Sequence, residues 1–131
     1  MASEVRKLKA NTVGIDSRGF IFASAVAYKL KMKLVMIRKK GKLPGKTHLI
    51  SYNLEYGSNN LEIQKDMVSK IDKVAIIDDI FATSGTMKAS INLIKRSKAK
   101  IKGVIVLLEL DFLKGRSKFK EKLISLENVS I

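Results

Sequence analysis

Apolar residues are distributed along this chain in two alternating patterns. Continuous or nearly continuous apolar runs at 12–15, 34–37, 74–77 and 101–108 predict buried strands, and a weaker run at 123–129 predicts a last one. Apolar residues at helical spacing predict helices at 19–30 and 86–95. Strands that alternate with helices favour an α/β fold, with a central, mainly parallel sheet flanked by helices.

The region between the second and third of these strands has a different pattern. Residues 41–45 contain the only proline of the chain, Pro44, and two glycines, which predicts a loop. Residues 51–55 and 61–64 predict an extended hairpin or flexible flap, with Gly57, Asn59 and Asn60 as its turn residues. The flexibility of such a hairpin would suit a lid over a binding site.

Composition limits the possible classes of protein. A chain of 131 residues predicts one domain over 1–131, and 46% hydrophobic with 29% charged residues is typical of a globular protein. No apolar run is long enough to span a bilayer, and residues 1–12 lack the apolar segment of a secretory signal, so we expect a cytoplasmic protein without a membrane partner. Without cysteine and with one histidine, the chain offers no cysteine- or histidine-based metal site.

The formal net charge of +14 raises the possibility of nucleic-acid binding. Of the 26 basic residues only five are arginine, and the lysines are scattered rather than clustered. No recognised nucleic-acid-binding motif accompanies them. The sequence therefore argues against nucleic acid as the primary partner, whereas a small polyanionic substrate is compatible with the charge.

Residues 74–86, VAIIDDIFATSGT, hold the most informative chemistry. The apolar run stops at Asp78 and Asp79, so we expect both acids at the carboxyl end of a buried strand, where ligands of open α/β sheets bind. Small and hydroxyl-bearing residues follow at 82–86, just before a predicted helix whose N-terminus favours a phosphate. The alternative is a solvated strand end followed by an ordinary helix cap.

This segment resembles the phosphoribosyl diphosphate (PRPP) signature of type I phosphoribosyltransferases. Four further blocks resemble one branch of that family, the adenine phosphoribosyltransferases, and they occur in the order found there: GIDSRGFIFASAVA (14–27), IRKKGKLPGKT (37–47), SYNLEYGSNNLEIQKD (51–66) and LLELDFLKGRSK (107–118). The resemblance implies the type I phosphoribosyltransferase fold with a flexible flap. It also implies transfer of the 5-phosphoribosyl group from PRPP to adenine, giving AMP and pyrophosphate in purine salvage.

The resemblance also implies roles for individual residues. Asp78 and Asp79 would accept hydrogen bonds from the ribose hydroxyls, and Glu55, on the flap, would be the catalytic acid/base or the carboxylate that stabilises the transition state. Leu110 would pack on the base, and Tyr56 would close over pyrophosphate from the flap. The 5-phosphate would be bound by Ala82, Thr83, Ser84, Gly85 and Thr86, and pyrophosphate by Ser17, Arg18, Gly19, Arg38 and Lys42.

For several of these residues a simpler interpretation stays open. Arg38 and Lys42 are also compatible with a solvated basic loop, and Leu110 with an ordinary core leucine. Glu55 is compatible with an exposed hairpin glutamate, to which Glu62 or Asp66 would be equivalent. Mg²⁺ is expected as the cofactor, bound mainly through the oxygens of PRPP. The family also implies a homodimer.

Only thirteen residues precede Gly14, whereas the family carries several dozen there, including a hood over the base. We therefore expect a truncated hood, with the PRPP half of the site more complete than the base-recognition half. Two alternatives to adenine transfer remain from the sequence. One is a phosphoribosyltransferase for another purine, and the other is a noncatalytic protein that binds PRPP or a nucleotide.

Overall fold

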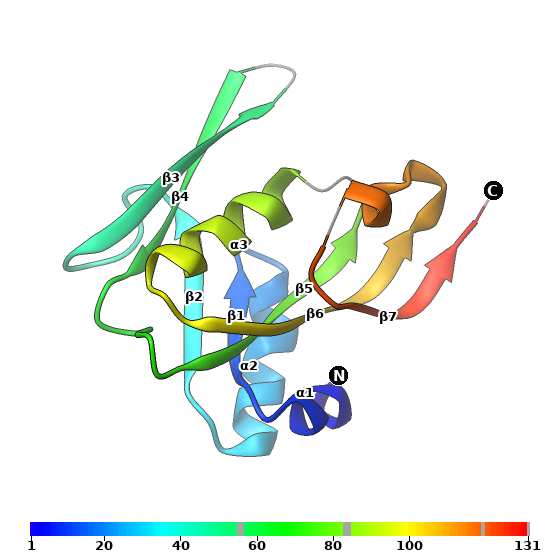
Figure 1. Cartoon of the computed structure of the whole chain (residues 1–131), viewed down its shortest axis with the longest axis horizontal. Helices are drawn as coiled ribbons and strands as arrows, with labels where there is room; N and C mark the ends of the chain where they lie inside the picture. The colour runs from blue at the N-terminus through cyan, green and yellow to red at the C-terminus, as the bar shows by residue number, and fades with distance from the viewer. Residues whose placement is uncertain (55–56, 83–84, 119, 131) are drawn as a thin grey trace.

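A seven-stranded sheet organises the described part of the computed structural model, which comprises residues 1–54, 57–82, 85–118 and 120–130. The strand order is β3-β4-β2-β1-β5-β6-β7 (Figure 1). The strands are β1 (Asn11–Ile15), β2 (Leu34–Lys39), β3 (Thr47–Leu54), β4 (Gly57–Gln64), β5 (Lys73–Phe81), β6 (Lys100–Leu110) and β7 (Leu123–Val129). The helices are α1 (Ala2–Leu8), α2 (Gly19–Leu30) and α3 (Gly85–Arg96), with short 3₁₀ turns η1 (Asp111–Leu113) and η2 (Gly115–Lys118).

Five strands form a parallel core, and two form an antiparallel hairpin attached to it. β1 pairs in parallel with β2 and β5, β5 pairs with β6, and β6 pairs with β7. The hairpin β3–β4 joins the sheet through only two register pairs, Arg38 with Glu62 and Lys39 with Leu61. The sheet is therefore mainly parallel, as the alternating pattern of the sequence predicts.

Helices cover both faces of the sheet because the central strands are apolar on both sides (Figure 1). Successive residues of a strand point to opposite faces. Ile76 accordingly belongs to the core cluster that contains α3, and Ile77 to the cluster that contains α1 and α2. None of the helices described has the length and apolar character needed to cross a membrane.

Two boundaries differ from those predicted. β5 continues to Phe81, so the acid pair lies inside the strand and not after it. Gly57, Asn59 and Asn60 were predicted as turn residues but belong to β4, where Asn59 pairs with Tyr52. Cross-strand pairing with β3 overrides the turn preference of these small polar residues.

The edge of the sheet at β6 and β7 is fixed by an ion pair between a buried carboxylate, Glu109, and a half-exposed guanidinium, Arg116. Glu109, whose side chain is 3% exposed, accepts hydrogen bonds from Arg116 Nη2 at 2.6 Å and Nε at 3.1 Å, and from Ser125 Oγ at 2.9 Å. The Arg116 guanidinium holds the pKa of Glu109 below its usual value despite burial. The same pair anchors η2 on the sheet. Gly115, the first residue of η2, packs closely on the end of β5, because a Cβ added there would lie 2.3 Å from the Ala82 carbonyl oxygen.

Candidate functional site

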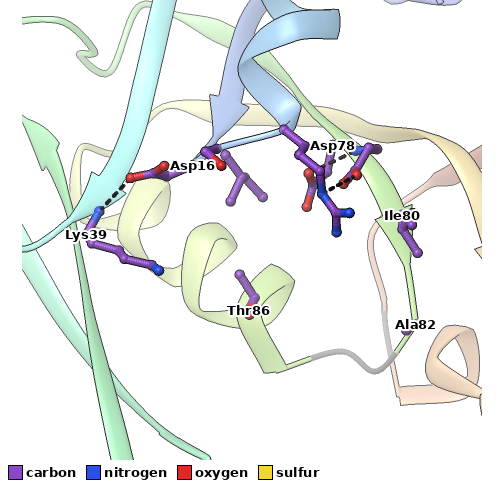
Figure 2. A pocket seen from close by; sticks show the side chains of 10 residues that line it. Asp16, Lys39, Asp78, Ile80, Ala82 and Thr86 are labelled. Atoms are coloured by element: carbon purple, nitrogen blue, oxygen red, sulfur yellow. Dashed lines mark hydrogen bonds and ion pairs between the residues drawn. The ribbon is translucent and has the colours of Figure 1, made fainter.

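A cavity of about 390 Å³ lies at the carboxyl ends of β1 and β5 (Figure 2). Parallel strands bring the segments that follow them to one edge of the sheet, and ligands of open α/β sheets bind at that edge. Figure 2 shows Thr86 across the cavity from Asp16 and Asp78. The cavity is lined by Ile15, Asp16, Ser17, Arg18, Lys39, Asp78, Asp79, Ile80, Ala82 and Thr86.

The N-termini of two helices reach this cavity from opposite faces of the sheet. Ser17 and Arg18 line it directly before α2 begins at Gly19, and Thr86 lines it as the second residue of α3. Unpaired backbone N–H groups and the helix dipole favour anions at such ends. Two helix N-termini therefore reach the cavity, one after β1 and one after β5, the strand that carries the acid pair.

Asp78 and Asp79 have different partners. Arg18 Nε lies 2.8 Å from Asp79 Oδ2, whereas Asp78 Oδ1 accepts a hydrogen bond from the backbone N–H of Asp79 at 2.8 Å. Burial raises the pKa of Asp78 to about 7, and the neighbouring Asp79 charge adds to that rise. Asp78 is thus a half-buried carboxyl group whose charged form is disfavoured by its surroundings.

Gly19 permits the turn before α2 to pack directly on β5. A Cβ at this position would lie 2.9 Å from Asp78 Oδ1 and 3.0 Å from the Ile77 carbonyl oxygen. Any larger residue would push α2 away from the acid pair. The predicted site residue Gly19 therefore lets the start of α2 pack against Asp78 of β5.

Asp16 and Lys39 belong to the cavity but were missed by the sequence reasoning. Asp16 Oδ2 accepts long hydrogen bonds of 3.4 Å from Arg38 Nε and from the Lys39 backbone N–H. The Arg38 guanidinium also lies 5.7 Å from the centre of the Phe20 ring. The signal available was an acid directly after a buried strand, the same feature that identified Asp78.

The predicted basic loop is held next to this region by a buried glutamate. Glu62, 6% exposed, accepts hydrogen bonds from the backbone N–H groups of Gly41 at 3.2 Å and Leu43 at 3.0 Å. Lys42 lies between these two residues and is exposed. Neither Lys42 nor Arg38 lines the cavity, although Arg38 contacts Asp16, which does.

The remaining predicted residues fall into three groups. Ala82 and Thr86 line the cavity, and Gly85 is the exposed first residue of α3. Leu110, at the end of β6, pairs with Val129 and does not line the cavity. Four predicted residues lie outside the described part of the structure, namely Glu55, Tyr56, Thr83 and Ser84.

Thr86 is fixed by contacts on both sides. Its backbone carbonyl accepts a hydrogen bond from Ser90 Oγ at 2.9 Å, and its hydroxyl donates to the Tyr52 hydroxyl at 3.3 Å. Tyr52 lies on β3 and was not among the predicted residues. Its sequence signal was weak: Ile50 and Tyr52 alternate with polar Ser51 and Asn53, which indicates only that one face of a strand is covered.

The donor set fits a metal ion held mostly by a substrate. Among the residues that the structure describes, no three or more histidine, cysteine, aspartate or glutamate side chains are grouped to hold a metal ion. The cavity nevertheless presents carboxylate oxygens of Asp16, Asp78 and Asp79. Mg²⁺ is commonly bound by one or two carboxylates, waters and substrate phosphates, and this arrangement is compatible with that mode.

Comparisons of the sequence and of the structure with known proteins agree on one family. The phosphoribosyl transferase domain family matches residues 12–128. The chain is 51% identical over 126 residues to the adenine phosphoribosyltransferase of Mycoplasma mobile, covering 96% of this chain and 73% of that protein.

Solved structures agree with this match. The adenine phosphoribosyltransferase of Giardia lamblia, complexed with 9-deazaadenine, superposes with a TM-score of 0.91 and 34% identity, covering 99% of this chain and 76% of that one. The Saccharomyces cerevisiae enzyme, complexed with an imino-altritol bisphosphate and adenine, gives a TM-score of 0.88 and 39% identity, covering 95% and 71%. The predicted type I fold is confirmed, and the chain belongs to the phosphoribosyl transferase domain family, in its adenine phosphoribosyltransferase branch.

Proposed function

We propose that this chain transfers the 5-phosphoribosyl group of PRPP to adenine, forming AMP and pyrophosphate in purine salvage. The observation that carries the proposal is one cavity that combines an acid pair with the N-termini of two helices. PRPP has the matching chemistry, with a phosphate at one end, a diphosphate at the other and a ribose between them. Membership of the family supplies the reaction.

In this reaction a bond forms between a purine nitrogen and the anomeric carbon of ribose. The bond from that carbon to the pyrophosphate oxygen breaks, and its electron pair leaves with pyrophosphate. By analogy with glycoside hydrolysis, the sugar passes through an oxocarbenium-like transition state. Asp78 and Asp79 would accept hydrogen bonds from the ribose hydroxyls and place negative charge near the developing cation.

The two helix N-termini at the cavity would divide the phosphates between them. Thr86, with Gly85 and the backbone of residues 82–84, would bind the 5-phosphate at the start of α3. Ser17, Arg18 and Gly19 would bind pyrophosphate at the start of α2. Arg18 contacts Asp79 through Nε, and its guanidinium carries further N–H groups that would donate to the leaving group.

The hairpin and the basic loop would enclose the bound substrates. Arg38 and Lys42 would add positive charge on the pyrophosphate side, and the family resemblance implies that Tyr56 closes over it from the flap. Glu55 would take the proton released by the purine nitrogen or stabilise the charge on the ring. Leu110 would contact the base. The roles of Glu55, Tyr56 and Leu110 rest on the family resemblance.

The proposal includes Mg²⁺, a homodimer and a cytoplasmic location, all supported by the family resemblance. Bound with PRPP, Mg²⁺ would neutralise phosphate charge and so make pyrophosphate a better leaving group. Asp78, Asp79 and Asp16 would hold it directly or through water. The chain's own residues would still supply the binding and orientation of the ribose.

Conversion of labelled adenine with PRPP and Mg²⁺ tests this proposal. Hypoxanthine and guanine, offered in parallel, separate adenine transfer from transfer to another purine. We expect AMP and pyrophosphate in equal amounts from adenine, and little product from the other two bases. Binding of PRPP without turnover of any base would contradict the proposal and indicate a nucleotide-binding protein.

A further inference from the structure

The hairpin β3–β4 rests on the same helix that would hold the 5-phosphate. Tyr52, on β3, accepts a hydrogen bond from the Thr86 hydroxyl at 3.3 Å, although the two residues are far apart in the sequence. Ile50 and Tyr52 pack against the core cluster that contains α3. At the other end of the helix, Arg96 donates a hydrogen bond to the Leu49 carbonyl. The hairpin is therefore fixed along the length of α3.

The two hydroxyl groups can exchange their hydrogen-bond roles without moving. A hydroxyl group offers one proton and accepts through its lone pairs, so either oxygen of the pair can be the donor. A phosphate oxygen only accepts at neutral pH, so it requires the Thr86 proton. Tyr52 can then donate its own proton to Thr86. The result is a chain of donors from Tyr52 to Thr86 to phosphate, in which each bond strengthens the next.

We propose that Tyr52 is a positioning residue for the 5-phosphate of PRPP, acting by holding the Thr86 hydroxyl as a donor to that phosphate. The inference rests on the proposed function, because it takes the start of α3 as the 5-phosphate position. Tyr52 also precedes Glu55 by three residues in the chain. The same contact thus links phosphate binding to the strand that leads to the catalytic residue proposed above.

Tyr52→Phe tests this role because it removes only the hydroxyl oxygen and keeps the packed ring. Titration calorimetry with ribose 5-phosphate should show binding about 10-fold weaker than in the unaltered protein, the effect of one lost hydroxyl–hydroxyl hydrogen bond in a chain that ends on the phosphate. Pyrophosphate, titrated separately, should bind with unchanged affinity because its position lies at α2. A general loosening of the fold would weaken both ligands equally and would overturn the proposal.

Two further variants complete the test. Tyr28→Phe is the matched control, because Tyr28 lies on α2 with 89% of its surface exposed, and it should leave ribose 5-phosphate binding unchanged. Thr86→Val should weaken binding of ribose 5-phosphate, and Tyr52→Phe should then add nothing to it. Additive losses, or unchanged binding in Tyr52→Phe alone, would overturn the role of Tyr52. Failure of the unaltered protein to bind ribose 5-phosphate would instead overturn the 5-phosphate position itself.

Discussion

Two carboxylate sites on adjacent strands of the same sheet have opposite electrostatic environments. On β6, Glu109 is buried and receives hydrogen bonds from Arg116 and Ser125, and its pKa lies below the usual value. On β5, Asp78 is half-buried beside a second acid, and its pKa is raised to about 7. The first site has protein partners for its charge, whereas the second leaves charge and hydrogen-bonding capacity available to a ligand.

The contrast predicts that breaking the Glu109 pair will give the largest loss of stability. Arg116→Ala leaves a carboxylate that is 3% exposed without its guanidinium, so we expect the free energy of unfolding to fall by roughly 3 kcal/mol. Urea unfolding measures this loss. Lys118→Ala, at an exposed lysine of the same 3₁₀ turn, is the control and should change stability by less than about 0.5 kcal/mol. Equal effects of the two substitutions would show that the pair is screened by solvent.

The acid pair on β5 should instead govern activity. Asp79→Asn removes the charge that would face the ribose and weakens the contact to Arg18, so we expect kcat/KM for PRPP to fall about 100-fold. Steady-state kinetics with varied PRPP measures this. Glu127→Gln, at an exposed acid of β7, should leave kcat/KM unchanged. Full activity of Asp79→Asn would contradict the proposed role of the acid pair.

Gly115 connects the two regions, so a substitution there should affect both. The Cβ of Gly115→Ala would overlap the Ala82 carbonyl oxygen at 2.3 Å, next to the proposed 5-phosphate position. We expect a loss of roughly 2 kcal/mol in stability together with weaker ribose 5-phosphate binding. In the control Gly103→Ala, the nearest atom to the added Cβ would be Leu8 Cδ1 at 3.0 Å, a flexible side-chain end that can move. Loss of stability with unchanged ligand binding would show that the two regions are independent.

The smallest effect concerns the pH dependence of stability. The pKa of Asp78 rises from 3.8 to about 7 on folding, so the folded protein binds more protons than the unfolded chain between these values. Stability therefore falls as pH rises from about 4 to about 7 through this group. Asp78→Asn removes that slope and should be more stable than the unaltered protein at pH 8 by about 1 kcal/mol, with the gain fading as the solution is acidified. Thermal unfolding at several pH values measures it, and a gain that grows on acidification would contradict the assignment.

The sequence predicted the elements of the parallel core well, because buried strands and amphipathic helices have strong periodic patterns. Asp78, Asp79 and Arg18 were predicted from their places after apolar runs of the sequence together with the family resemblance, and all three line the cavity. Tyr52 was missed because its importance comes from a neighbour distant in the chain, Thr86. Asp16 did carry a local signal, an acid directly after a buried strand, but that signal was not applied to it. The turn predicted at Gly57–Asn60 was wrong because pairing across the hairpin, which no local pattern encodes, decides the conformation there.

The parallel ladder between β1 and β5 has a consequence for folding kinetics. Asn11 of β1 pairs with Val74 of β5, so the chain must close a long loop before the turn at Ser17 meets the acid pair. Pairing of this kind is slow, whereas the β3–β4 hairpin closes over a few residues. The binding cavity thus forms late, and the return of ligand binding during refolding reports the closure of the central sheet.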